Sequence, residues 1–181
     1  MLVFCALGTL QGARRALFAT MAQACAALGA RAVIGHGGGL SPAEEASLPC
    51  APPLPAFWPQ AAVRRRCSAA ISHGGFNTVL AALAAGVPIV ALPIGFEQPA
   101  TAARLVRVGA GRMLSPRQLS ARAGGRLGSC DRASYRRSAR SIAAGIAAGR
   151  RYGEGGRPRQ RRANISRLNA GSCHQGVPGL R

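Results

Sequence analysis

The chain has 181 residues, 48% apolar and 4% aromatic, which excludes a disordered chain and suits one domain with a core of Ala, Val, Leu and Ile. The net charge of +19 comes from 24 basic residues, all of them Arg, and such an excess ordinarily indicates a nucleic acid or an anionic membrane as the partner. Its distribution weakens that interpretation, because residues 1–118 carry net +7 and residues 119–181 carry net +12.

Short apolar runs and amphipathic stretches alternate through the first 118 residues. In chain order, the predicted elements are a strand at 2–6, a helix at 13–28, a strand at 31–34, a capped helix at 41–47, an extended Pro-rich segment at 50–60, a strand at 69–72, a helix at 75–85, a strand at 89–92 and a helix at 101–108. This alternation predicts an α/β fold: a doubly wound, Rossmann-like parallel sheet with helices on both faces.

The pattern decays after the first 118 residues, which we interpret as one donor-binding domain. Residues 119–149 are predicted to be a weakly helical extension, with a helix at 135–148, and residues 150–181 an irregular, Arg-rich tail. The tail is compatible with a disordered basic arm, a nucleic-acid-binding tail or out-of-frame translation of a GC-rich gene. Arg without any Lys, beside Gly, Ala, Pro and Ser, favours the third origin.

Six Cys and three His are scattered without metal-binding spacing, which excludes a zinc-finger or iron–sulfur interpretation. Unpaired cysteines favour a reducing, cytoplasmic location. The apolar start lacks a basic segment, so we interpret it as a buried strand rather than a signal peptide. The uncharged run at 79–96 is broken by Gly86, Pro88 and Pro93, which predicts a helix, a turn and a strand rather than a membrane span.

The most informative stretch contains a strand, a glycine turn and a helix start. The strand ends at Ser72, the turn is His73-Gly74-Gly75, and the helix begins around residues 76–78. Free backbone N–H groups and the positive end of the helix meet at this point, and they form an anion site that glycines leave open to a phosphate. The side chains of His73 and Asn77 are placed to add hydrogen bonds to the same anion.

Two further pairs of residues extend this site. Glu97 and Gln98 follow the next strand, on the same edge of the sheet, and a carboxylate beside a carboxamide suits paired sugar hydroxyls. Phe57 and Trp58 offer a flat apolar surface for a planar base. Phosphate, sugar and base sites in one domain indicate a nucleotide-sugar pocket.

The stretch at 57–105 resembles the donor-binding signature of the UDP-glycosyltransferase family, whose GT-B fold has two Rossmann-like domains. The matching motifs are FWPQ at 57–60, HGGFNTVL at 73–80, GVP at 86–88 and FEQPATAARL at 96–105. LGTLQG at 7–12 and HGGGLS at 36–41 add a likeness to the carotenoid branch that glucosylates zeaxanthin. The resemblance covers residues 2–118 and, weakly, 132–149.

The resemblance implies which residues contact a nucleotide-sugar donor. They are Gly8, Thr9, Phe57, Trp58, Gln60, His73, Gly74, Gly75, Asn77, Thr78, Glu97 and Gln98. His73 and the helix start would bind the pyrophosphate, with the loop of Gly8 as a second phosphate-side loop. Phe57 or Trp58 would stack on the base, and Glu97 with Gln98 would hold the sugar hydroxyls.

The implied activity is transfer of a hexose, glucose by this likeness, from a UDP-sugar to a hydroxyl of a small hydrophobic acceptor such as zeaxanthin, without a metal or a further cofactor. Two departures from the family pattern bear on it. Ala81 stands where the family has an acid credited with binding the ribose. The family's acceptor domain, with its His base, precedes the strand at 2–6. We therefore expect a donor-binding half without a catalytic base, weak or inactive without that N-terminal partner.

Alternatives remain open at this point. A non-catalytic basic protein would bind nucleic acid or acidic lipid through the Arg-rich tail. A glycosyltransferase acting on a lipid-linked acceptor would share the GT-B fold, although LGTLQG and HGGGLS disfavour it. With the glycosyltransferase interpretation we expect no nucleic-acid partner and a cytoplasmic chain, with peripheral membrane contact as a further option. Glu44-Glu45 and Arg64–Arg66 are interpreted as solvated groups, and the role of His36 is left open.

Overall fold

The structure is a computed structural model that describes residues 1–8, 11–49, 60–119 and 133–150. The predictions for Thr9, Phe57 and Trp58 lie outside these residues, as does the tail after residue 150.

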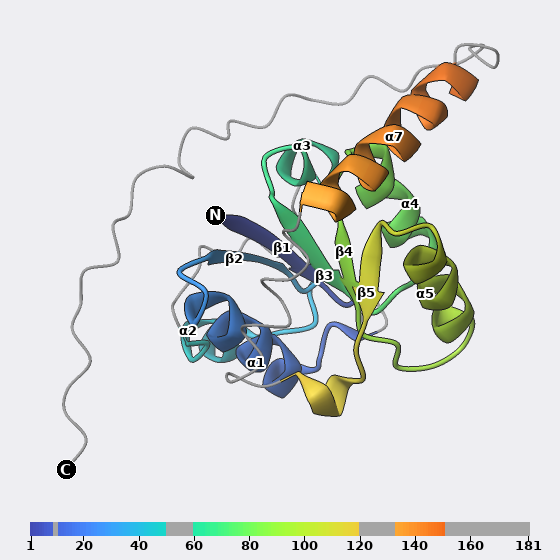
Figure 1. Ribbon diagram of the computed structural model, residues 1–181. Coiled ribbons are helices and arrows are strands. Elements are labelled where there is room, and N and C mark those ends of the chain that lie inside the picture. The colour runs from blue at the N-terminus through green and yellow to red at the C-terminus, as the bar shows by residue number, and fades with distance from the viewer. Residues whose placement is uncertain (9–10, 50–59, 120–132, 151–181) are drawn as a thin grey trace.

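A parallel sheet forms the centre of the molecule (Figure 1). Its strands are β1 (Leu2–Ala6), β2 (Arg31–Gly35), β3 (Ala69–Ser72), β4 (Ile89–Ala91) and β5 (Gly111–Met113). They lie side by side in the order β2-β1-β3-β4-β5, and each neighbouring pair is parallel. The predicted doubly wound parallel sheet is confirmed. Sequence reasoning missed β5, a three-residue edge strand with the charged Arg112 at its centre.

Helices fill the connections between these strands and follow the last strand, β5. They are α1 (Arg15–Ala26), α2 (Pro42–Ala46), α3 (Gln60–Arg64), α4 (Phe76–Ala84), α5 (Gln98–Arg107), a 3₁₀ turn at Pro116–Gln118 and α7 (Ala133–Arg150). Two predictions need correction. Gln60 begins the short helix α3 rather than ending an extended segment. Helix α5 begins at Gln98 instead of residue 101, because Pro99 fits the first turn, where no N–H is needed.

The strand residues alternate between two cores, as the pleat of a sheet requires. On one face, Val3, Cys5 and Leu7 pack with α1, whose Phe18 and Met21 are fully buried. On the other face, Phe4 and Ala6 belong to a core that includes residues of α3, α4, α5 and α7. Figure 1 shows α1 on the opposite side of the sheet from α4 and α5. The sheet is therefore covered on both faces, as predicted.

Helix α7, predicted only as a weak helix, packs along α4 (Figure 1). Its Ala139 is fully buried, and Ile142 and Ile146 pack against the core on the α4 face. A methyl group placed on Gly86, just after α4, would lie 3.3 Å from Cγ of Arg140, so the two segments pack closely. Tertiary packing of this apolar stripe outweighs the helix-weakening Gly145.

Arg64 is not solvated, contrary to the interpretation of the run 64–66. Its side chain is 2% exposed, and its guanidinium lies 5.1 Å from the centroid of the Phe4 ring. Arg65 and Arg66 are exposed, as expected. Three consecutive arginines do not indicate that the side chain of one of them is buried. Which residue of α3 faces β1 depends on how the helix packs on the sheet.

We expect Arg64→Ala to lower the free energy of unfolding by about 1–3 kcal/mol, since it removes a buried cation–π contact and the packing of the side-chain stem. Arg65→Ala, an equal loss of charge at an exposed position, should change it by less than about 0.5 kcal/mol. Urea denaturation followed by circular dichroism measures both. Equal effects of the two substitutions would contradict the structural role of Arg64.

Candidate functional site

The candidate site lies at the edge of the sheet where the parallel strands end. Strand order reverses around β1, because the chain goes from β1 to β2 on one side and then to β3 on the other. In open α/β sheets, ligands bind beyond the strand ends at such a switch point. The residues that follow β1 and β3 there are Gly8 and His73.

The His73 ring lies between two glycines from these loops. A methyl group placed on Gly8 would lie 2.9 Å from Cε1 of His73, and one placed on Gly75 would collide with Nε2. Gly8 also has a φ of 74°, which side chains rarely adopt. Both positions therefore require glycine for the ring to occupy this place. The predicted residues Gly8, His73 and Gly75 are brought together.

The turn at 72–75 leaves the start of α4 open. Gly74 has a φ of 86°, and its N–H donates to Oγ of the buried Ser72 at 3.0 Å. Gly75 is the N-cap of α4 and supplies no side-chain cap. Within the described part of the chain, no hydrogen bond engages the N–H groups of residues 76–78. These groups and the helix dipole can bind an anion.

The two predicted helix-start side chains differ in exposure. Asn77 is exposed in the first turn of α4, and Thr78 is half-buried beside it. Ala81, one turn further, is also half-buried. Asn77 is therefore free to reach an anion at the helix start.

The loop between β4 and α5 lies against the same turn. A methyl group placed on Gly74 would lie 3.5 Å from the carbonyl oxygen of Gln98. Gln98 is 5% exposed, and its Oε1 accepts the N–H groups of Ile94 at 2.8 Å and Gly95 at 3.0 Å. Its carboxamide oxygen therefore holds its own loop, a contact that sequence reasoning missed.

Glu97 and Phe96 present the exposed side of this loop. Glu97 is the exposed N-cap residue of α5. Phe96 has a φ of 56°, unusual for a residue with a side chain, and is 82% exposed. A carboxylate and an apolar ring thus stand next to each other at the mouth of the site.

Burial lowers the pKa of His73 below its ordinary value. The carbonyl of Ala6 and the carboxylate of Glu97 act in the opposite direction and raise this pKa, but burial is the largest effect. Glu97 is thus the exposed carboxylate whose charge acts on the His73 ring. The free site therefore favours an uncharged imidazole.

The glycine loop after β2, residues 36–40, lies against the loop after β1. A methyl group on Gly12 would collide with the carbonyl oxygen of His36, and one on Gly39 would collide with the Gly12 backbone. His36 is fully buried, and its Nε2 lies 2.9 Å from Oε1 of Glu45. His36, whose role the sequence left open, therefore makes a structural contact. Glu45 is its partner and is only 25% exposed, so the interpretation of Glu45 as simply solvated is wrong. Glu44 forms the predicted capping box with Ser41.

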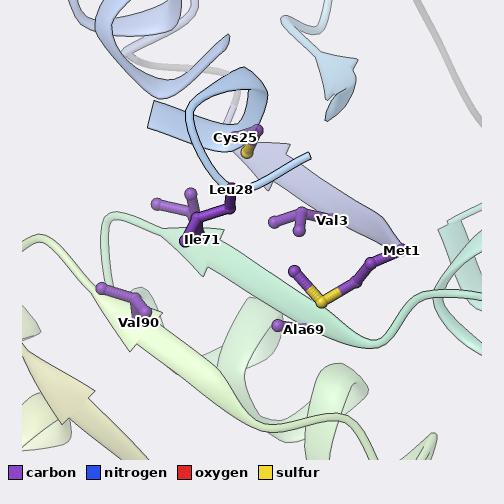
Figure 2. Close-up of a pocket in the computed structure, with 7 residues that line it drawn as sticks. All are labelled: Met1, Val3, Cys25, Leu28, Ala69, Ile71 and Val90. Carbon is purple, nitrogen blue, oxygen red and sulfur yellow. The ribbon is translucent and has the colours of Figure 1, made fainter. Parts of the chain in front are cut away.

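Other features lie away from these residues. A hollow of about 10 Å³ on the α1 face is lined by apolar side chains: Met1, Val3, Cys25, Leu28, Ala69, Ile71 and Val90 (Figure 2). This hollow lies near the starts and middles of the strands, away from the strand ends where the candidate site is.

Among the described residues, no group of three His, Cys, Asp or Glu could hold a metal ion. None of their helices is long and apolar enough to cross a membrane.

Residues 21–150 match the family described as the erythromycin biosynthesis protein CIII-like, C-terminal domain. The chain belongs to this family of glycosyltransferase C-terminal domains. It is 49% identical over 115 residues to the zeaxanthin glucosyltransferase of Pseudescherichia vulneris, a match that covers 62% of this chain and 28% of that enzyme. The zeaxanthin glucosyltransferase of Pantoea ananas is 39% identical over 115 residues, covering 62% and 27%. This glycosyltransferase domain thus spans less than a third of these relatives.

Solved glycosyltransferases share the fold. The calicheamicin glycosyltransferase CalG4 superimposes with a TM-score of 0.73 at 30% identity, covering 81% of this chain and 39% of that one. The glycosyltransferase SsfS6 of Streptomyces sp. SF2575, complexed with thymidine diphosphate, has a TM-score of 0.62 at 27% identity, covering 81% and 37%. The predicted resemblance to GT-B glycosyltransferases is confirmed.

We expect His73 of this glycosyltransferase domain to titrate below its ordinary pKa in an NMR titration of the ring protons. Glu97→Gln should lower that pKa further, because it removes the charge that favours the imidazolium. Glu44→Gln, a matched change in α2 at a group that does not act on the His73 pKa, should leave it unaltered. An unchanged His73 titration in Glu97→Gln would contradict the proximity of the two groups.

The lowered pKa also has a consequence for stability. The unfolded chain binds the proton more tightly than the folded chain, so the free energy of unfolding should fall as the pH drops below the ordinary His pKa of about 6.5. His73→Asn should flatten this dependence between pH 5 and pH 7. Urea denaturation across that range tests it.

Proposed function

We propose that this domain binds the donor of a UDP-sugar-dependent glycosyltransferase, which transfers glucose to a hydroxyl of a hydrophobic acceptor such as zeaxanthin. The observation that carries the proposal is the His73 ring held between Gly8 and Gly75 beside the open start of α4. The likeness to two zeaxanthin glucosyltransferases supports the choice of sugar and acceptor. SsfS6 is complexed with thymidine diphosphate, which supports a donor whose leaving group is a nucleoside diphosphate.

In this proposal the pyrophosphate lies at the start of α4. The N–H groups of residues 76–78 and the side chains of Asn77 and Thr78 donate to its oxygens, and the turn glycines allow close approach. When the bond to the sugar breaks, negative charge grows on the leaving diphosphate. The helix end is fixed before the reaction and stabilises that charge without reorganising. We therefore propose transfer without a metal ion.

His73 would donate a hydrogen bond to the same diphosphate. Its ring favours the uncharged form in the free domain, because burial lowers its pKa. A bound anion would act in the opposite direction and raise this pKa, so donor binding should take up a proton near neutral pH. This makes His73 a ligand of the diphosphate in our proposal; we place the base that activates the acceptor in the part of the relatives that this chain does not span.

Glu97 and Gln98 would bind the donor sugar in different ways. The Gln98 oxygen already accepts two backbone N–H groups, so its contribution to the sugar is an amide N–H donor. The exposed Glu97 carboxylate would accept from sugar hydroxyls. We assign base stacking to Phe57 or Trp58, with Gln60 nearby, and a second phosphate contact to Gly8 and Thr9. The exposed Phe96 offers the hydrophobic acceptor an apolar surface.

For the cell we propose a cytoplasmic location with peripheral membrane contact through exposed arginines. Free cysteines in the core, at Cys5, Cys25 and Cys67, support a reducing compartment.

Isothermal titration calorimetry with UDP and UDP-glucose tests donor binding. We expect His73→Ala to weaken UDP binding about ten-fold or more, since a hydrogen bond to a charged group is worth about 1.5–3 kcal/mol. Arg65→Ala, an exposed change at the opposite edge of the sheet, should leave binding unaltered. Binding that depends steeply on salt and is indifferent to His73 would contradict the proposal.

Ala81 supplies a second test, because the family's ribose-binding acid is missing there. Ala81→Glu should tighten UDP binding by about ten- to a hundred-fold, through a charged acceptor for the ribose hydroxyls. Ala103→Glu, on the exposed side of α5, makes the same change of charge away from the site and should have little effect. Equal tightening by both variants would indicate a general charge effect.

The sugar and acceptor are tested in a chimera. Residues 2–118 would replace the corresponding segment of the P. vulneris zeaxanthin glucosyltransferase, and product formation from UDP-glucose and zeaxanthin would be followed by chromatography. We expect a glucoside, and its loss in the His73→Ala chimera. A chimera that binds UDP-glucose and forms no product would contradict the assigned reaction.

A further inference from the structure

We propose that His36 is a positioning residue of the donor site: its buried imidazole fixes the glycine loop at 36–40, and that loop holds the β1–α1 loop that carries Gly8. The inference rests on the proposed function for its meaning in catalysis. The contacts that support it belong to the described residues and involve neither the helix start of α4 nor any assumed ligand.

Both nitrogens of the buried ring face polar groups. Nδ1 accepts the N–H of Leu40 at 3.1 Å, so this nitrogen carries no proton in the structure. The ring proton therefore sits on Nε2, which lies 2.9 Å from Oε1 of Glu45 in α2. The hydrogen bond to Nδ1 therefore holds the ring at the end of its own loop, and Nε2 faces the Glu45 carboxylate of the following helix in a close contact without hydrogen-bond geometry.

The fixed loop contacts the β1–α1 loop through backbone atoms. The His36 carbonyl accepts the N–H of Gly39 at 3.2 Å and lies against Gly12. Gly39 lies against the backbone of Gly12 and Ala13. No side chain separates the two loops at this point, so a displacement of one requires a displacement of the other.

A second contact joins the same elements. Nε of Arg15, the first residue of α1, donates to Oγ of Ser47 at 2.9 Å, just after α2. Helix α2 therefore contacts the β2–α2 loop through Glu45, and the residue just after it, Ser47, is hydrogen-bonded to the start of α1. These contacts hold the β1–α1 loop at its α1 end, and Gly8, at the β1 end, lies against His73.

The chemistry of the pair indicates a positioning role. Burying an imidazole and a partly buried carboxylate costs solvation, and an apolar side chain of similar size at such a place often stabilises a protein as well or better. What an apolar residue does not supply is direction, because it neither accepts from Leu40 nor faces Glu45. His36 thus favours one geometry of the glycine loops, and in our proposal that geometry is the one that binds the diphosphate.

The test compares UDP affinity with stability in three variants of the chain. His36→Leu removes both polar contacts, whereas His36→Asn keeps an oxygen near the position of Nδ1 to accept the Leu40 N–H. Ile146→Ala, on α7 far from both loops, is the control for lost stability. UDP dissociation constants are measured by calorimetry well below each variant's unfolding midpoint, and amide hydrogen exchange is measured without nucleotide.

The N–H of Arg14 donates to the carbonyl of Gln11 within the β1–α1 loop at 3.3 Å and reports on that loop. We expect His36→Leu to weaken UDP binding about ten-fold and to speed exchange at the N–H groups of both Leu40 and Arg14. His36→Asn should recover most of the affinity, and Ile146→Ala should leave it unchanged. An unchanged affinity in His36→Leu would overturn the proposal, as would a loss in His36→Leu that Ile146→Ala matches.

Failure of the proposed function would look different. If the unaltered chain binds no nucleoside diphosphate, the donor assignment fails, and the exchange data then decide the positioning role alone. Faster exchange at Arg14 in His36→Leu, restored in His36→Asn, would support it. Faster exchange confined to the loop at 36–40 would overturn it.

Discussion

The candidate site depends on one close contact, in which the imidazole of His73 lies between Gly8 and Gly75 with no room for a side chain on either. This contact exists because β1 and β3 are parallel neighbours, with Ala6 paired to Ser72 in register. The two strands therefore end at the same level, and the loops that follow them meet. A change of register by one residue would move His73 to the other face of the sheet and leave the glycines without a partner.

The same register determines what remains free at the edge. Ser72 is the last residue of β3, and its hydroxyl accepts the N–H of Gly74, which holds the turn at a positive φ. The helix that follows starts without a side-chain cap, so the N–H groups of its first turn point out of the sheet edge. A glycine N-cap is a weaker helix start than Ser or Asp, and its benefit lies in the open access to those N–H groups.

Local patterns predicted much of this arrangement and failed where distant contacts decide. The apolar runs and the glycine turn at 73–75 sufficed for β1 to β4 and for α4, because they are local signals, whereas the three-residue β5 has no apolar run and was missed. Two contacts depend on how the helices pack on the sheet and have no local signal. They are the contact of Arg64 with the Phe4 ring and that of Glu45 with His36. The occupied oxygen of Gln98 escaped prediction for a related reason: a carboxamide at a loop is equally able to bind a sugar or its own backbone. Nothing in the sequence decides between these partners.

The polar groups at this edge therefore fall into two sets. One set is satisfied within the protein: the oxygen of Gln98, the hydroxyl of Ser72 and Nδ1 of His36 each accept a backbone N–H and hold a loop in place. The other set includes the first-turn N–H groups of α4, Asn77 and the exposed Glu97. Groups of the first set exchange hydrogen bonds to water for hydrogen bonds within the protein on folding. They therefore make the loops rigid and do not themselves bind the ligand. Because the loops are fixed in this way, the second set can meet a charged ligand with little further ordering, which lowers the entropic cost of binding.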